Sequence, residues 1–306
     1  MKILLLAHKK APGTIRLVAE AEKMKLDLVA AQVNELQFVT DHERTGVFLR
    51  GQDIVKTFDT VIIRDIYPYI SEALTVAKIF ADTQKIVIDK SFTDQGYSIS
   101  KMHDYLLLAQ RGIPVPRTIQ IFKNKSLVKK TARQFGFPLI LKGIHGSHGN
   151  HVFKVEDDKQ LEEKRAAYQE GELLLQEYIQ NDCDYRIIVI GYHALPYAIK
   201  RFPTKNDFRT NLDLGSTWQK VPLTHELKSI SEKSAKILRR EFAAVDIRYR
   251  GALPLVLEVN RRPGFIGFEH ATNINVAKIF SEYVKIRVQS KNSNPSHLWI
   301  ASLRSQ

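Results

Sequence analysis

Short apolar runs alternate with helical patterns over the first third of the chain. Residues 2–7 form the first apolar run, and residues 14–25 then carry apolar side chains at the spacing of one helix face. Two further apolar runs, at 60–64 and 85–89, flank a second helical pattern at 71–81. Because strand, helix and strand follow one another at this spacing, we predict a small parallel α/β layer here.

The turn after the first predicted strand lacks the glycine pattern of dinucleotide-binding proteins. It reads HKKAPG over residues 8–13, whereas that pattern requires glycines at three fixed positions. A polar turn at 94–96 then closes this part of the chain. We therefore expect residues 1–95 to form an α/β domain that holds no dinucleotide.

The rest of the chain mixes strands and helices without an internal repeat. A helical pattern over 101–111 precedes Gly112, Pro114 and Pro116, which predict a left-handed cap and then a stop. Later apolar runs predict strands at 137–142, 151–155, 173–177, 185–190, 195–201, 244–249 and 255–260, and helical patterns lie at 126–135 and 225–240.

The composition is that of a globular protein with about two domains. Of the 306 residues, 44% are hydrophobic and 26% charged, which excludes a disordered, collagen-like or low-complexity chain. No apolar stretch approaches the ~18 residues that span a bilayer, and the opening run is too short for a signal-peptide core. We therefore expect a cytoplasmic protein without a membrane partner. The single cysteine, Cys183, excludes an intramolecular disulfide and a multi-cysteine metal site.

The net charge of +13 is concentrated in the second part of the chain. Residues 1–95 carry 13 basic and 13 acidic side chains, whereas residues 96–306 carry 33 and 20. A field of one sign attracts polyanions such as nucleic acid, acidic lipid, nucleotide phosphates or an acidic polypeptide. A basic surface without a specific partner is the alternative, so the motifs must decide.

The strongest group of candidate ligands is Asp246 with Glu258 and Asn260. Glu258 and Asn260 share one strand face, and a hairpin centred on Ala252 places Asp246 opposite Glu258. Two carboxylates and an amide oxygen suit Mg²⁺ when a polyphosphate completes its coordination. The alternative is an ordinary hairpin whose carboxylates are neutralised by three arginines, namely Arg248, Arg261 and Arg262.

A second candidate is Lys142, which ends an apolar strand before the loop GIHGSHG at 143–149. Glycines let backbone N–H groups close over phosphate oxygens, and the lysine adds a positive charge. The loop does not match the Walker pattern, because no Gly-Lys-Ser/Thr precedes a helix. A plain hairpin tip is the alternative.

Two polar segments complete the candidates. The strand end at 175–179 leads into a turn at 184–186, and such an end offers backbone groups to a purine edge and a carboxylate to ribose. The polar segment 207–211 follows Lys200 and Arg201, and it could equally be a surface loop.

These elements occur in the order and spacing of the ATP-grasp ligases, and the chain resembles the RimK group. That group adds glutamate or related amino acids to a carboxyl terminus or an acidic side chain. The matching stretches are 100–101, 107–116, 137–149, 176–179, 184–186, 207–212, 245–247 and 257–264. Together they cover about residues 96–285, and the strand at 61–64 fits the family's first domain.

The resemblance implies an α/β fold of the α+β ATP-grasp class. A Rossmann-like pre-ATP-grasp domain would span 1–95, a two-lobed ATP-grasp domain 96–289 with its lobe boundary near 180, and a tail 290–306. The implied cofactors are ATP and Mg²⁺, with Mn²⁺ as an alternative.

The resemblance also implies roles for individual residues. Lys101 and Lys142 would contact the phosphates together with Ser147 of the loop, Glu177 and Tyr178 would line the adenine pocket through backbone atoms, and Asp184 would hold ribose. Arg209 and Asn211 would face the reacting phosphoryl and carboxyl groups as catalytic residues beside Lys142, and Asp246, Glu258 and Asn260 would bind the metal.

Two features depart from the family pattern. His145, His148 and His151 stand where the family loop usually carries other residues. Their spacing in a loop is no defined metal-ligand pattern, so phosphate contacts are the alternative. Arg261 and Arg262 replace residues that are usually small, which suggests a more negatively charged acceptor.

The implied activity is that of an ATP-dependent carboxylate–amine ligase that forms an acyl phosphate and releases ADP and phosphate. Glutamate is the expected amine, and an acidic protein, peptide or small carboxylate is the expected acceptor. Two alternatives stay open, namely a ligase for a small metabolite or carrier protein and a non-catalytic basic protein that binds nucleic acid. The RNA-binding motifs rich in aromatic residues are absent from the sequence, which makes nucleic acid the weaker candidate. The sequence leaves the choice between a monomer and a homo-oligomer open.

Overall fold

The computed structural model describes residues 1–290 except 41, 43, 65, 95–99, 122–124, 145–151, 166–172, 181, 205, 206, 208 and 211–215. Its first unit is a four-stranded parallel sheet in the order β2-β1-β6-β7. The central strands β1 (Lys2–Leu6) and β6 (Thr60–Ile63) are almost entirely buried, as expected for a parallel sheet covered on both faces. The remaining elements are β2 (Asp27–Ala31), β7 (Ile86–Ile88), α1 (Pro12–Lys23) and α3 (Ile70–Asp82).

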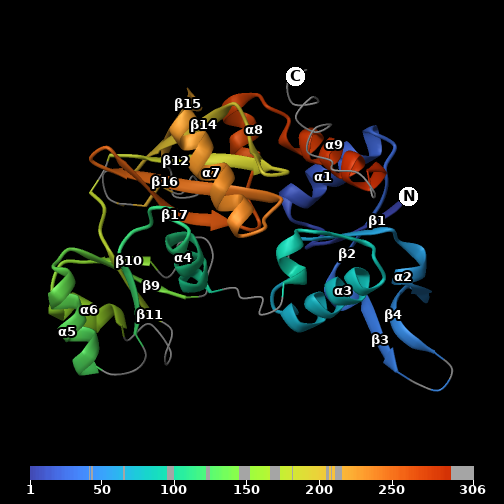
Figure 1. Cartoon of the computed structure of the whole chain (residues 1–306), viewed down its shortest axis with the longest axis horizontal. Coiled ribbons are helices and arrows are strands. Elements are labelled where there is room, and N and C mark those ends of the chain that lie inside the picture. Colours follow the sequence, from blue (N-terminus) through green and yellow to red (C-terminus); the bar gives the residue numbers. More distant parts are fainter. Residues whose placement is uncertain are drawn as a thin grey trace.

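A small antiparallel sheet projects from this layer (Figure 1). It is inserted between β2 and β6, and it follows a short 3-10 helix, η1 (Val33–Glu35). Asp53 caps the helix α2 by accepting hydrogen bonds from the backbone N–H groups of Val55 and Lys56. The elements are β3 (Leu36–Thr40), β4 (Thr45–Leu49), β5 (Gln52–Asp53) and α2 (Ile54–Thr57).

A second unit, called the small lobe here, spans residues 118–177 and has its own hydrophobic core. Its antiparallel sheet has the order β10-β9-β11-β8. The helix α4 (Lys101–Gln110) precedes it, and Gly112, two residues after the end of this helix, has a φ of +74°, which confirms the predicted left-handed conformation. The lobe consists of β8 (Thr118–Ile121), α5 (Lys125–Phe135), β9 (Leu139–Gly143), β10 (Val152–Val155), α6 (Asp158–Arg165) and β11 (Leu173–Glu177).

The third unit is a large antiparallel sheet in the order β15-β14-β12-β16-β17, with β13 paired to β12. The helix α7 packs against β12 and β16. The elements are β12 (Asp184–Ile190), β13 (His193–Ala194), β14 (Tyr197–Phe202), β15 (Thr217–Pro222), α7 (His225–Ile237), β16 (Phe242–Arg250), β17 (Leu253–Asn260), α8 (Ile266–Thr272) and α9 (Val276–Gln289).

One hydrophobic core joins the parallel sheet to the large sheet. Its members include Leu5 and Ile62 from the parallel sheet, Ile188 and Phe242 from the large sheet, and Phe280 from α9. The helices α1 and α9 pack side by side (Figure 1), and both contribute side chains to this core. The first and the third unit therefore form one block, although the sequence boundary at residue 95 lies between them.

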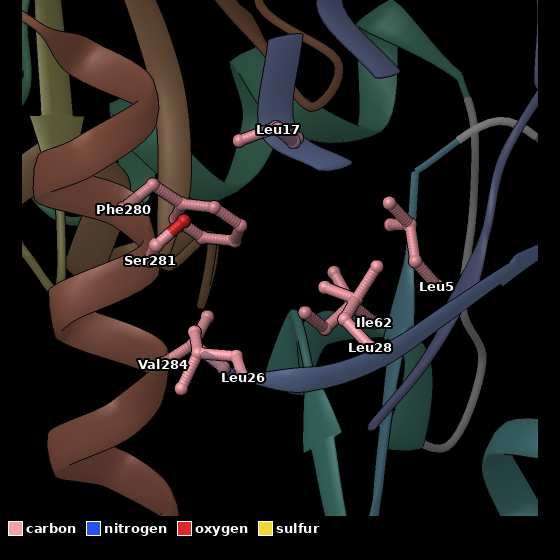
Figure 2. Close-up of a pocket in the computed structure, with 8 residues that line it drawn as sticks. All are labelled: Leu5, Leu17, Leu26, Leu28, Ile62, Phe280, Ser281 and Val284. Carbon is pink, nitrogen blue, oxygen red and sulfur yellow. The ribbon is translucent and has the colours of Figure 1, made fainter. Parts of the chain in front are cut away.

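A small pocket opens inside this block, between α9 and the strands β1 and β2 (Figure 2). Its lining is apolar except for Ser281. It therefore lacks the charged groups that a nucleoside triphosphate needs, and it is a packing gap.

None of the helices in the described part of the chain is long and apolar enough to span a membrane.

Candidate active site

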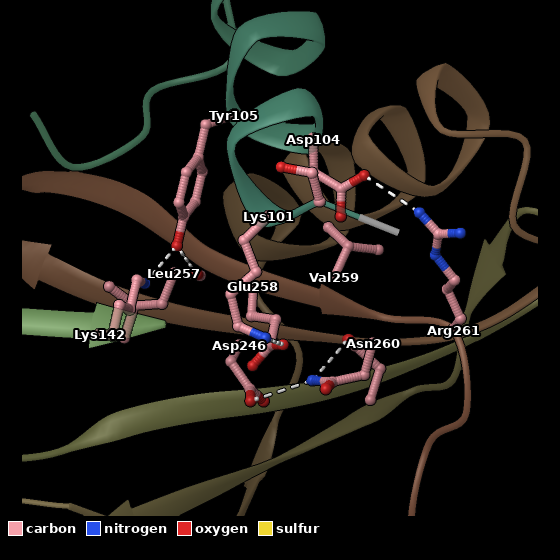
Figure 3. A network of polar contacts seen from close by, with 12 residues as sticks. Lys101, Asp104, Tyr105, Lys142, Asp246, Leu257, Glu258, Val259, Asn260 and Arg261 are labelled. Atoms are coloured by element: carbon pink, nitrogen blue, oxygen red, sulfur yellow. Dashed lines mark hydrogen bonds and ion pairs between the residues drawn. The ribbon is translucent and has the colours of Figure 1, made fainter. Parts of the chain in front are cut away.

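The site is built on the hairpin of β16 and β17, where Asp246 pairs with Glu258. Asn260 lies two residues further along β17 and shares the face of Glu258. Asp246, Glu258 and Asn260 therefore point to the same side of the large sheet (Figure 3). The predicted pairing of Asp246 with Glu258 is confirmed.

A β-bulge produces this pairing. Near the turn, Arg250 pairs with Leu253 and Ile247 with Val256, and an unbroken ladder would pair Asp246 with Leu257. Glu258 would then lie on the opposite face, because a slip of one residue reverses every side chain. Leu257 instead has no partner in the ladder, and the extra residue brings Glu258 opposite Asp246. The hairpin is thus not centred on Ala252 as predicted.

Two arginines of the neighbouring strands neutralise Asp246. Arg186 donates from Nε and Nη2 to the two carboxylate oxygens, both at 2.8 Å, and Arg201 Nη2 lies 3.3 Å from Oδ1. Burial alone would raise the pKa of Asp246, but the positive charges of Arg186 and Arg201 outweigh it and lower the pKa to about 2. Asp246 is therefore an anion at any physiological pH. Its partners are not Arg248, Arg261 or Arg262, which the sequence suggested.

Glu258 and Asn260 are more open. Lys101 Nζ lies 3.1 Å from Glu258 Oε1, and the negative charge of Glu258 raises the pKa of Lys101. Asn260 Nδ2 donates to Asp246 Oδ2 at 3.3 Å, and a turn of the amide would present its oxygen to the same space. Two carboxylates and one amide on one face form a hard-oxygen set that fits Mg²⁺. The third member of this set is an amide, and the described residues contain no group of three or more His, Cys, Asp or Glu side chains that could hold a metal ion.

Lys142 comes from the small lobe and reaches the same space. Its Nζ donates to the Tyr105 hydroxyl at 2.7 Å and to Gln176 Oε1 at 3.0 Å, and only 7% of the residue is exposed. Burial lowers the pKa of Lys142 to about 7; the charge of Glu258 opposes this shift, and that of Lys101 adds to it. Lys101, Lys142 and Glu258 thus lie close together where the small lobe meets α4 and β17 (Figure 3).

The end of β11 connects the small lobe to the β16–β17 hairpin. The Glu177 carboxylate accepts hydrogen bonds from Arg250 at 2.9 Å and from the backbone N–H of Arg117 at 2.8 Å. The Lys154 ammonium lies 4.5 Å from the centre of the Tyr178 ring. Glu177 and Tyr178 lie where the small lobe meets the large sheet, and an adenine ring is predicted to bind their backbone there.

Asp184 lies inside the sheet rather than at its surface. It is 3% exposed, Arg201 donates to its two oxygens at 2.7 and 3.0 Å, and the Thr210 hydroxyl donates to Oδ2. Both oxygens thus hold Arg201 and the segment around Thr210, and the ribose contact of Asp184 stays a prediction.

Arg209 belongs to the segment that Thr210 attaches to the sheet. Its guanidinium forms an ion pair with Asp207 at 2.6 Å, and it is half-buried. Asn211 and Ser147 lie outside the described residues, as do His145, His148 and His151.

Four residues of the site had no predicted role, namely Tyr105, Gln176, Arg186 and Arg201, although the last three lie in or beside the segments singled out in the sequence. Arg186 and Tyr105 had a local signal, because Arg186 is two residues from Asp184 on a strand and Tyr105 is four residues from Lys101 on a helix. Gln176 and Arg201 had no local signal that distinguishes them from ordinary strand residues, because their partners Lys142 and Asp246 are distant in sequence.

Comparison with known proteins identifies the family. A model of the RimK-like ATP-grasp domain matches residues 99–284. The chain belongs to the RimK-like ATP-grasp family. It is an ATP-grasp ligase, an enzyme that uses ATP to form an amide bond, and the predicted family, fold class and enzyme class are confirmed.

Curated relatives and solved structures agree with this result. The chain is 28% identical over 290 residues to "Probable alpha-L-glutamate ligase 1" of Shewanella sp. (strain MR-4), covering 92% of this chain and 94% of the relative. A relative with a similar name from Shewanella amazonensis is 30% identical and covers 82% of this chain and 84% of its own length. The ATP-grasp ligase PsnB complexed with its minimal precursor superimposes with a TM-score of 0.70 at 17% identity, over 96% of this chain and 99% of PsnB. D-alanine–D-alanine ligase from Bacillus anthracis superimposes with a TM-score of 0.64 at 18% identity, over 95% and 97% of the two chains.

Proposed function

We propose that this RimK-like ligase joins glutamate to a carboxyl group of an acidic protein or peptide through an acyl phosphate. The observation that carries the proposal is the site itself. Lys101, Lys142 and Arg186 surround a hard-oxygen set for Mg²⁺, with no histidine base among the described residues that form it. Such a site stabilises charge on phosphoryl and acyl oxygens and does not depend on a protein base.

The first step is attack of an acceptor carboxylate oxygen on the γ-phosphorus of ATP, which breaks the bond to ADP. The amine nitrogen of glutamate then attacks the acyl carbon, phosphate leaves with the bonding electrons, and the amine loses a proton to form the amide. Both steps place negative charge on oxygens near Lys142 and Arg209, whose cations stabilise it.

Three residues would hold the metal in this site, namely Asp246, Glu258 and Asn260. Mg²⁺, or Mn²⁺ in its place, neutralises the phosphate oxygens when it is bound. Arg186 and Arg201 hold the Asp246 carboxylate in place between the strands. Lys101 and Lys142 would contact the phosphates with Ser147, the backbone of Glu177 and Tyr178 would bind adenine, and Asn211 would act beside Arg209.

The acceptor proposal is supported by the charge of the second part of the chain. Residues 96–306 carry all of the +13 net charge. The strand β17 carries Glu258 and Asn260 and is called the metal strand. Arg262 is exposed two residues after its end, and Arg261 lies 3.5 Å from Asp104. The names of the glutamate-ligase relatives and the peptide-bound state of the PsnB structure also support an amino acid and a peptide as substrates.

Release of ADP with a panel of acceptors and amines tests the function. We expect turnover with glutamate and a peptide that ends in or is rich in Glu, and a mass gain of one glutamyl residue per event. A matched peptide with Gln in place of Glu should be a poor acceptor. Turnover only with small metabolites or a carrier protein would overturn the acceptor proposal, AMP as product would overturn the acyl phosphate, and nucleic-acid binding without turnover would overturn both.

A further inference from the structure

Tyr105 lies where the small lobe, α4 and the metal strand meet (Figure 3). It is 4% exposed, and its hydroxyl forms two hydrogen bonds. The hydroxyl donates to the backbone carbonyl of Leu257 at 2.6 Å and accepts from Lys142 Nζ at 2.7 Å. A phenol has one hydrogen to donate, so the bond to Leu257 leaves its lone pairs to Lys142. The Tyr105 hydroxyl is therefore the donor to Leu257 and the acceptor from Lys142.

The partner of Tyr105 on β17 is the residue that sets the register of the metal ligands. Leu257 is the extra residue of the bulge, and Glu258 follows it directly. The residue before Leu257 is also held from outside the sheet, because the Val256 N–H donates to the Pro114 carbonyl at 2.9 Å. Tyr105 therefore supports the bulge at the point on which the pairing of Glu258 depends.

The partner of Tyr105 in the small lobe is the lysine that we expect at the phosphates. In its ammonium form, which a phosphate oxygen beside it favours, Lys142 has three N–H donors, and two of them go to Tyr105 and Gln176. Gln176 is itself oriented, since its Nε2 donates to the Thr118 hydroxyl at 2.8 Å. These two fixed acceptors direct the third N–H, which is left for a ligand oxygen.

The same helix carries the second lysine of the site. Lys101 is one turn before Tyr105 on α4, so both side chains lie on one face of that helix. Lys101 pairs with Glu258 at 3.1 Å, while Tyr105 donates a hydrogen bond to Leu257, the residue before Glu258. One helix face therefore contacts two consecutive residues of β17 and the lysine of the opposite lobe.

We propose that Tyr105 is a positioning residue that fixes Lys142 relative to the metal strand and thereby sets the affinity for Mg·ATP. The proposal rests on the proposed function only in that Lys142 binds the ATP phosphates. It assigns Tyr105 no contact with substrate.

The test is a double-mutant cycle on ATP affinity, measured by calorimetry with Mg²⁺ and without an acceptor. We expect Tyr105→Phe to raise the ATP Kd about tenfold, since it removes a hydrogen bond to a charged group. In the Lys142→Ala background the same change should alter the Kd less than about twofold. Equal effects in both backgrounds would overturn the proposal.

A matched control separates positioning from fold support. Tyr283 is also 4% exposed, and its hydroxyl donates to the buried Glu241 at 2.5 Å, away from the site. Tyr283→Phe should lower the Tm and leave the ATP Kd unchanged, whereas the same loss of ATP affinity in both variants would overturn the proposal. In steady state, Tyr105→Phe should raise the KM for ATP and leave that of the acceptor within about twofold.

If Tyr105→Phe does not fold, Tyr105→Met serves as the second variant, because it also lacks the hydroxyl and still fills the space. Failure of both to fold, with Tyr283→Phe folded, would assign Tyr105 to fold support and overturn the proposal. Because the calorimetry uses ATP alone, its result stands whether or not glutamate proves to be the amine. A failure of the glutamate assay is thus distinct from a failure of this inference.

Discussion

Asp246 faces Glu258 across two strands, yet the two carboxylates are held very differently. The side chain of Asp246 is 10% exposed and is bound by Arg186 and Arg201, whereas that of Glu258 is 37% exposed and pairs with Lys101. Both belong to the proposed metal set. Their loss should therefore have the same effect on turnover and different effects on stability.

The first prediction concerns these two carboxylates. Glu258→Gln should abolish Mg²⁺-dependent ADP release and change the Tm little, because the partly exposed side chain loses one ion pair, with Lys101. Asp246→Asn should also abolish release, and it should lower the free energy of unfolding by about 3 kcal/mol, since two guanidinium groups lose their buried anion. Magnesium titrations of ADP release and denaturant unfolding measure the two effects.

Glu163→Gln is the control for this pair, because Glu163 is an exposed carboxylate that pairs with Lys164 at 2.7 Å outside the site. It should change neither quantity. Near-normal ADP production by Glu258→Gln at saturating Mg²⁺ would contradict the metal assignment.

The second prediction concerns the phosphate lysine. Lys142→Ala should raise the ATP Kd at least tenfold, because a charge-assisted hydrogen bond to a phosphate is lost in a buried place. Calorimetry with ATP and Mg²⁺ measures this. Lys228→Ala removes an exposed lysine that pairs with Glu232 on α7, and it should leave the Kd unchanged. Unchanged ATP affinity in Lys142→Ala would show that this lysine does not bind the nucleotide.

The third prediction concerns the acceptor. Exposed charges act over a screened distance of about 8–10 Å at moderate salt, so the acceptor KM should rise with ionic strength more steeply than the ATP KM. Replacing Arg261 and Arg262 together by Gln should raise the KM of an acidic acceptor several-fold and change ATP binding little. Because Arg262 is exposed whereas Arg261 is partly buried, Arg262→Gln alone should produce most of the effect.

A steady-state salt series with acidic and neutral peptides measures these constants. Arg133→Gln is the control, since Arg133 is an exposed arginine that pairs with Asp158 on the small lobe. Equal use of both peptides at every salt concentration would disprove the electrostatic selection of the acceptor.

The fourth prediction concerns stability and pH. Burial and the charge of Glu241 raise the pKa of Asp89 to about 7, although the backbone N–H groups of Glu241 and Phe242 donate to its Oδ1 and Arg64 lies near. In the unfolded chain the pKa of this carboxyl is about 3.8, so between the two pKa values only the folded chain binds the proton. The contribution of Asp89 to stability is therefore present at low pH and is lost as the pH rises towards 7.

Asp89→Asn keeps the acceptor oxygen and removes the charge. Relative to the unchanged chain, the variant should gain on the order of 3 kcal/mol of unfolding free energy between pH 4 and pH 8. Urea unfolding at the two pH values measures the gain. Asp82→Asn, which removes an exposed carboxylate paired with Lys78, should show none of it, and an equal gain in both variants would contradict the assignment.

The sequence predicted elements where the apolar pattern is continuous. The runs that became β1, β6, β9 and β11 are buried on both faces, and each was found within a few residues. The edge strand β15 is exposed at nearly every position and has no apolar pattern, so it was missed.

The same limit applies to the site. Strand periodicity correctly placed Glu258 and Asn260 on one face. The predicted pairing of Asp246 with Glu258 was also correct, although it rested on a turn centre at Ala252 that the structure does not have. Strand periodicity cannot predict the bulge at Leu257, because an unpaired residue shifts the register without changing the composition of the strand. Tyr105 and Gln176 reach Lys142 across 37 and 34 residues, and no local pattern encodes such a contact.

The shared core under α1 and α9 has a consequence for how the molecule melts. Side chains of the parallel sheet and of the large sheet occupy one apolar cluster, while the small lobe encloses another. Cooperative units follow cores, because residues in one core lose their contacts together. The chain should therefore lose its structure in two units, residues 118–177 as one and the remainder as the other. Unfolding of the small lobe alone would remove Lys142 from the site, so nucleotide would be released while the metal strand keeps its own core.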